Sequence, residues 1–83
     1  MNRQEIIETT NRILADEFEK DSAEFAPDSD IKATLELDSL ALVDMVALLE
    51  DEFKVKITGQ EIVEVKTFEK LYDFLDGKLK KAA

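Results

Sequence analysis

The sequence predicts an all-α protein: a four-helix bundle with a long first loop and a short third helix. Two segments repeat apolar residues at three- and four-residue spacing, and a third is apolar over most of its length. Residues that cap helices well stand before these segments, and the 83 residues include only two Gly and one Pro. A chain this short builds one modest core, so we expect a single domain over residues 1–83.

The first helix is expected from about Arg3 to Glu19. Acidic and basic residues fill the positions between its apolar residues, as on the solvent side of an amphipathic helix. The apolar stripe consists of Ile6, Thr10, Ile13, Leu14 and Phe18.

Residues 20–37 break this rhythm and are expected to form a long loop. They contain the only proline, Pro27, and a run of alternating charge at residues 28–30. Loops of this length in small domains usually have a function. The residues expected to anchor the loop in the core are Phe25, Ile31, Leu35 and Leu37.

The second helix is expected from Ser39 to Phe53. Asp38 is a good N-cap residue, because its carboxylate can accept backbone N–H bonds at the positive end of the helix dipole. This N-cap would place the hydroxyl of Ser39 at a defined corner of the molecule.

The rest of the chain predicts an extended link and two more helices. Residues 54–57 read as the link, and Thr58 with Glu61 has the spacing of a capping box that opens a short helix over residues 59–64. Thr67 can cap a last helix running to about Lys80. Its apolar stripe is Phe68, Leu71, Tyr72, Phe74 and Leu75.

Composition excludes several classes of function. The chain has no Cys and no His, which removes disulfides, thiolate nucleophiles, imidazole bases and nearly all zinc chemistry. Asp28 and Asp30 lack the third ligand and the glycine of an EF-hand, so no metal site is predicted. A serine nucleophile needs a base within reach, and none is evident, so we expect a protein that is not an enzyme.

Charge points to the kind of partner. Twenty acids against eleven bases give a net charge of −9, which disfavours nucleic acid and anionic membranes and favours basic protein patches. The longest apolar run, Met45 to Leu49, is far too short for a membrane span, and the N-terminus has no apolar core of a secretory signal. We therefore expect a monomeric cytoplasmic protein with no nucleic-acid partner.

The second helix has more apolar surface than a small bundle can bury. Its expected core face contains Leu42, Val46, Leu49 and Phe53. The opposite face then points to solvent as a docking surface, unless its apolar residues tuck under the first loop. Six acids and no base stand between residues 36 and 52, which favours a basic partner. The outer face contains Leu40, Val43, Asp44 and Ala47.

The segment Asp38-Ser39-Leu40, at the start of a helix after a long loop, resembles the phosphopantetheine attachment motif of acyl carrier proteins. Chain length, acidity, helix order and the acidic end of the second helix resemble this family over essentially the whole chain. The resemblance implies that Ser39 covalently carries phosphopantetheine from coenzyme A. The arm would carry acyl groups as thioesters in fatty-acid, lipid or polyketide-type biosynthesis.

The resemblance also implies partners and further residues. The partners would be a phosphopantetheinyl transferase and acyl-transferring or synthase enzymes with basic docking patches. Residues at partner-binding positions are Leu40, Val43, Asp44, Ala47, Glu50 and Asp51. Candidates for an acyl pocket are Val46, Leu49, Ile57, Val65 and Leu71, which could equally be ordinary core.

Three positions depart from the family pattern. Glu36 stands where a glycine is common, Ala41 where an acid often follows the motif, and Leu42 where a polar residue is common. These departures favour a specialised carrier. Two alternatives remain at this point: an aminoacyl or peptidyl carrier domain, and an acidic interaction module that is never pantetheinylated.

Overall fold

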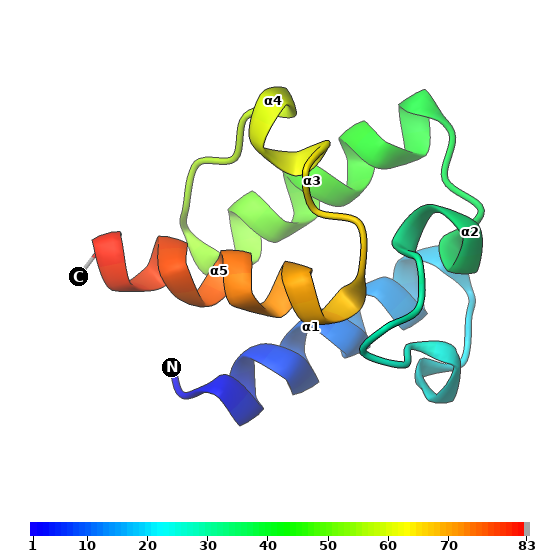
Figure 1. Cartoon of the computed structure of the whole chain (residues 1–83), viewed down its shortest axis with the longest axis horizontal. Coiled ribbons are helices and arrows are strands. Elements are labelled where there is room, and N and C mark those ends of the chain that lie inside the picture. The colour runs from blue at the N-terminus through cyan, green and yellow to red at the C-terminus, as the bar shows by residue number, and fades with distance from the viewer. Residues whose placement is uncertain (83) are drawn as a thin grey trace.

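The computed structural model describes residues 1–82 as a bundle of helices, and this part of the chain contains no strand (Figure 1). The predicted all-α fold is confirmed, with three long helices joined by segments that contain shorter ones. The elements in order are α1 (Arg3–Phe18), the 3-10 helix η1 (Ser22–Glu24), α2 (Ile31–Leu35), α3 (Ser39–Phe53), α4 (Gly59–Ile62) and α5 (Phe68–Ala82).

The long helices begin and end where the local sequence dictates. Asn2 opens α1 with a capping box, its side chain accepting from the backbone N–H of Glu5 at 2.9 Å. Helix α1 ends one residue earlier than expected, because Glu19 turns to a left-handed φ of 53°. The predicted cap at Thr67 is confirmed, with Lys70 N–H donating to its hydroxyl at 3.3 Å.

The long loop contains a helix that the sequence did not predict. Asp30 caps α2 by accepting from the backbone N–H of Ala33 at 2.8 Å, and Ile31 and Leu35 bury one side of this single turn. Five residues are too short for a helical repeat to be visible in a sequence. The predicted anchors Phe25, Ile31 and Leu35 are buried, whereas Leu37 is only half-buried.

Backbone hydrogen bonds join this loop to the start of α5. Ile31 N–H donates to the Lys66 carbonyl at 2.9 Å, and Glu69 N–H donates to the Pro27 carbonyl at 2.9 Å. The ring of Phe25 stacks on the buried ring of Phe68 with their centroids 4.8 Å apart. The loop is therefore fixed to the bundle on both sides of Pro27.

The core face of α3 differs from the predicted one. Met45, Leu49 and Phe53 are the buried residues, whereas Leu42 and Val46 are half-buried at the edge of the core. Helix α4 is too short to cover this edge, and Leu42 and Val46 line an open groove beside it. The buried face of α3 therefore includes Met45, and the predicted residues Leu42 and Val46 lie at its edge.

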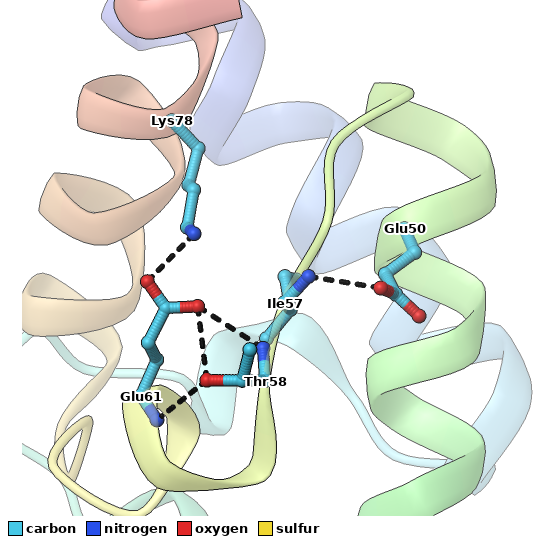
Figure 2. Close-up of polar contacts among 5 residues, drawn as sticks. All are labelled: Glu50, Ile57, Thr58, Glu61 and Lys78. Carbon is cyan, nitrogen blue, oxygen red and sulfur yellow. Dashed lines mark hydrogen bonds and ion pairs between the residues drawn. The ribbon is translucent and has the colours of Figure 1, made fainter.

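Two acidic side chains hold the link and α4 in place (Figure 2). Glu50 accepts from the backbone N–H of Ile57 at 2.8 Å. Glu61 accepts from the backbone N–H of Thr58 at 3.0 Å, completing the predicted capping box, and pairs with Lys78 of α5 at 2.6 Å. Helix α4 ends at Ile62 and not at residue 64 as expected. Beyond Ile62 the backbone N–H groups of Glu64 and Val65 donate to carbonyls three residues earlier, so the α-helical pattern stops.

Replacing Lys54 with Gly should stabilise the protein. Lys54 follows α3 with a left-handed φ of 57° and makes only a 3.9 Å ion pair with exposed Asp51. Glycine adopts this conformation without the steric cost that other residues bear, so we expect a gain of about 1 kcal/mol in the free energy of unfolding. Urea denaturation measures this change.

The matched control is Lys56→Gly, where φ is not positive and a loss of about 0.5–1 kcal/mol is expected. A loss in both variants would contradict the argument.

The contacts of Glu61 should make stability depend on acidity. Hydrogen bonds from Lys78 and Thr58 lower the pKa of Glu61 from 4.5 to about 2. A carboxyl with a lowered folded-state pKa contributes its stabilisation fully above the unfolded-state pKa and loses it as pH falls toward the folded value. We therefore expect Glu61→Gln to lower the melting temperature at neutral pH and to lose less stability than the wild type between pH about 5 and about 2. Glu64→Gln, whose exposed side chain has no hydrogen bond or ion pair with the described residues, serves as control and should follow the wild type.

Candidate functional site

Ser39 is the first residue of α3 and its side chain is exposed. Asp38 before it has extended backbone, and its carboxylate accepts from the backbone N–H of Ala41 at 2.8 Å, which confirms the predicted N-cap. That carboxylate is therefore engaged in capping the helix. The site presents a bare hydroxyl at the positive end of a 15-residue helix.

The chain leading to Ser39 is held by short-range contacts. Glu36, where the family pattern has glycine, closes α2 with a left-handed φ of 55°. Its side chain forms an ion pair with Lys20 at the start of the long loop, and the hydrogen bond from Lys20 lowers the pKa of Glu36. Leu37 N–H donates to the Lys32 carbonyl at 3.0 Å. Glutamate in place of glycine thus keeps the left-handed turn, and its side chain connects the two ends of the long loop through Lys20.

A hollow of about 240 Å³ opens beside Ser39. Its lining includes one serine, one lysine, two leucines and one aspartate whose carboxylate already caps α3, a set that suits a phosphate ester followed by an aliphatic chain. The residues present therefore fit phosphopantetheine. The hollow is lined by Lys32, Leu37, Asp38, Ser39 and Leu42.

The outer face of α3 lies open to solvent. Leu40 is 77% exposed and Val43 is 64% exposed, so the alternative in which they tuck under the loop is wrong. Asp44, Ala47 and Asp51 are exposed as well. The sixth partner-binding candidate, Glu50, is half-buried, because its carboxylate reaches the backbone of the link (Figure 2).

An apolar groove of about 270 Å³ runs between α3 and α4. Of the five acyl-pocket candidates only Val46 lines it. Leu49 and Leu71 are fully buried, Ile57 is buried and Val65 is half-buried in the core. Ile62 and Val63 form the side of the groove that belongs to α4, and the sequence did not single them out. The capping box predicts that a helix begins here, but it does not predict which helix packs beside it. The groove is lined by Leu42, Val43, Val46, Ala47, Glu50, Gly59, Ile62 and Val63.

Two further observations concern the described residues as a whole. Nowhere in residues 1–82 do three or more acidic side chains gather in a way that could hold a metal ion. Among the same residues, no helix is both long and apolar enough to cross a bilayer. The chain has no imidazole and no thiol, so the Ser39 hydroxyl has no histidine base in this chain.

Known proteins are similar to this chain in sequence and in fold. The family model described as "Phosphopantetheine attachment site" matches residues 11–75. The acyl carrier protein of Thermosynechococcus vestitus is 34% identical over 79 residues, covering 95% of this chain and 98% of the relative. That of Micrococcus luteus is 33% identical over 76 residues, covering 92% and 94%. The structure of an acyl carrier protein from Enterococcus faecalis has the same fold, with a TM-score of 0.79 at 24% identity over 94% of this chain and 99% of that one.

The family match covers most of the chain and includes the whole segment around Ser39. The relatives align over nearly their full lengths, and the solved structure has the same fold over 94% of this chain. The chain therefore belongs to the acyl carrier protein family, with an acyl carrier role and phosphopantetheine as its cofactor.

Proposed function

We propose that Ser39 is the residue that takes phosphopantetheine. The observation that carries this proposal is an exposed serine hydroxyl at the capped start of α3, beside a hollow whose donors suit a phosphate ester. Ser39 stands within the segment Asp38-Ser39-Leu40 and within the matched residues 11–75.

The part of this chain in the loading reaction is that of a substrate. The Ser39 oxygen forms a bond to the pantetheine-side phosphorus of coenzyme A, the adenosine bisphosphate half leaves, and the transferase takes the serine proton. Bound phosphopantetheine supplies a terminal thiol, which holds an acyl group as a thioester and leaves more readily than an alkoxide. Asp38 fixes the helix start, and the chain itself carries out no catalysis.

The outer face of α3 is proposed as the docking surface for the transferase and for the enzymes that load and use the acyl group. Its apolar centre, Leu40 and Val43, is flanked by the acidic side chains of Asp44 and Asp51. A rim of one charge around an apolar centre suits a partner with a basic rim. We further propose a single carrier domain that acts as a cytoplasmic monomer.

The departures Glu36, Ala41 and Leu42 support a specialised carrier with a narrow set of partners. Ala41 removes a negative charge from the first turn of α3, next to Ser39. Half-buried Leu42 lines both the hollow at Ser39 and the groove toward α4. Each change alters a surface near the attachment point while leaving the hydroxyl itself free.

Loading tests the attachment residue directly. Incubating the apo protein with coenzyme A and a broad-specificity phosphopantetheinyl transferase should add the mass of one phosphopantetheinyl group. We expect Ser39→Ala to abolish this gain, because the nucleophilic oxygen is lost. The matched control is Ser22→Ala, an exposed serine at the start of η1, which should load like the wild type.

Intact-mass spectrometry measures loading of the wild type, Ser39→Ala and Ser22→Ala. The mass of the protein purified from its source also identifies the acyl cargo. An aminoacyl cargo would favour the peptidyl carrier alternative. No mass gain with several transferases would support the interaction module that is never pantetheinylated, and a gain retained in Ser39→Ala would place attachment elsewhere.

Charge reversal tests the docking surface. Asp44→Lys should slow transferase loading by roughly three- to tenfold at low salt, with a smaller effect at high salt, because a rim charge acts mainly on association. Asp44 is exposed, so folding should hardly change. Glu8→Lys on α1 makes the same change in net charge on another helix and should load normally. Equal slowing in both variants would mean that total charge, and not this surface, controls docking.

A further inference from the structure

Lys32 is the one basic side chain among the residues that line the hollow at Ser39. It lies on α2, is exposed, and has no carboxylate within ion-pair distance among residues 1–82. The two nearest acids in the sequence on the Ser39 side are already engaged. Glu36 pairs with Lys20, and the carboxylate of Asp38 accepts from Ala41.

The backbone of Lys32 is tied to the turn that leads into Ser39. Its carbonyl accepts from the N–H of Glu36, the residue that closes α2, and from the N–H of Leu37 at 3.0 Å. Asp30 holds the other end of α2 by capping it. The base of the Lys32 side chain is therefore fixed relative to Ser39, although the two residues come from different helices.

A phosphodiester on Ser39 would add a negative charge at an already acidic place. The chain carries a net charge of −9, and Asp38 stands beside the attachment point. A lysine that lines the same hollow would offset this repulsion, because its ammonium group can form charge-assisted hydrogen bonds with phosphate oxygens. The positive end of the α3 dipole acts in the same direction.

The rest of the hollow suits the next part of the arm. Leu37 and Leu42, both half-buried, line the hollow together with Lys32. In phosphopantetheine the phosphate is followed by a methylene and then by a carbon that bears two methyl groups, which favours contact with apolar side chains. The charge and the apolar surface of the arm thus both have counterparts in the lining of the hollow.

We propose that Lys32 is a positioning residue that contacts the phosphodiester on Ser39 and holds the first part of the arm in this hollow, against Leu37 and Leu42. The proposal rests on attachment at Ser39. It assigns Lys32 a role toward the cofactor and not toward docking enzymes.

Phosphorus NMR of the fully loaded protein tests the contact without any partner enzyme. Wild type, Lys32→Gln, Lys32→Arg and Lys56→Gln are each loaded, and intact mass verifies complete loading before any spectrum is recorded. We expect the phosphodiester resonance to move in Lys32→Gln, to return toward the wild-type position in Lys32→Arg, and to stay in place in Lys56→Gln. Lys56 is an exposed lysine in the link and serves as the matched control for loss of one positive charge.

A second measurement uses the unmutated protein and so does not depend on the fold of a variant. Proton–carbon spectra of the lysine side chains should show the Lys32 ε-methylene signal moving between apo and holo protein, with Lys56 unmoved and the difference reduced at high salt. An unmoved Lys32 signal together with one phosphorus resonance position in all four proteins would overturn the proposal. Failure to load at all is a separate result, which overturns attachment at Ser39 instead.

Discussion

Backbone hydrogen bonds between the long loop and the start of α5 fix the segment that leads to Ser39. The Ile31 to Lys66 bond and the Glu69 to Pro27 bond connect residues that lie some 35 to 42 positions apart in the chain. A loop of this length would otherwise retain considerable conformational entropy, and α2 alone is too short to be stable. With the loop held, the single turn of α2 can present Lys32 and lead into the capped start of α3.

Helix α3 has two apolar faces, one buried and one exposed. Met45, Leu49 and Phe53 are buried and hold the helix in the bundle. Leu40 and Val43 remain exposed, at an energetic cost that a helix with a purely structural role would avoid. The rigid inner face gives the outer face a fixed orientation relative to Ser39, so a partner that recognises the outer face also locates the attachment point.

The acidic residues likewise divide into two groups. Asp38 accepts a backbone hydrogen bond that fixes the start of α3. Glu50 and Glu61 accept backbone hydrogen bonds that fix the link between α3 and α4 and the start of α4 (Figure 2). Asp44 has no such internal partner among the described residues and contributes to the field around the outer face. A count of acids along the chain cannot separate these groups, because the difference depends on which backbone N–H groups the fold brings near each carboxylate.

The sequence by itself determined the order of α1, α3, α4 and α5, the caps at Asp38, Thr58 and Thr67, and the position of the attachment motif. These follow from interactions within a few residues, namely side chain to backbone contacts and helical periodicity. Only the tertiary structure decided that Met45 is buried while Leu42 is at the edge of the core, and that Glu50 turns inward. It also decided that residues 31–35 form a helix and that α4 forms the wall of a groove with Ile62 and Val63. Each of these depends on contacts between segments distant in the chain, which set the rotation of a helix and the neighbours of a carboxylate in ways that local patterns leave open.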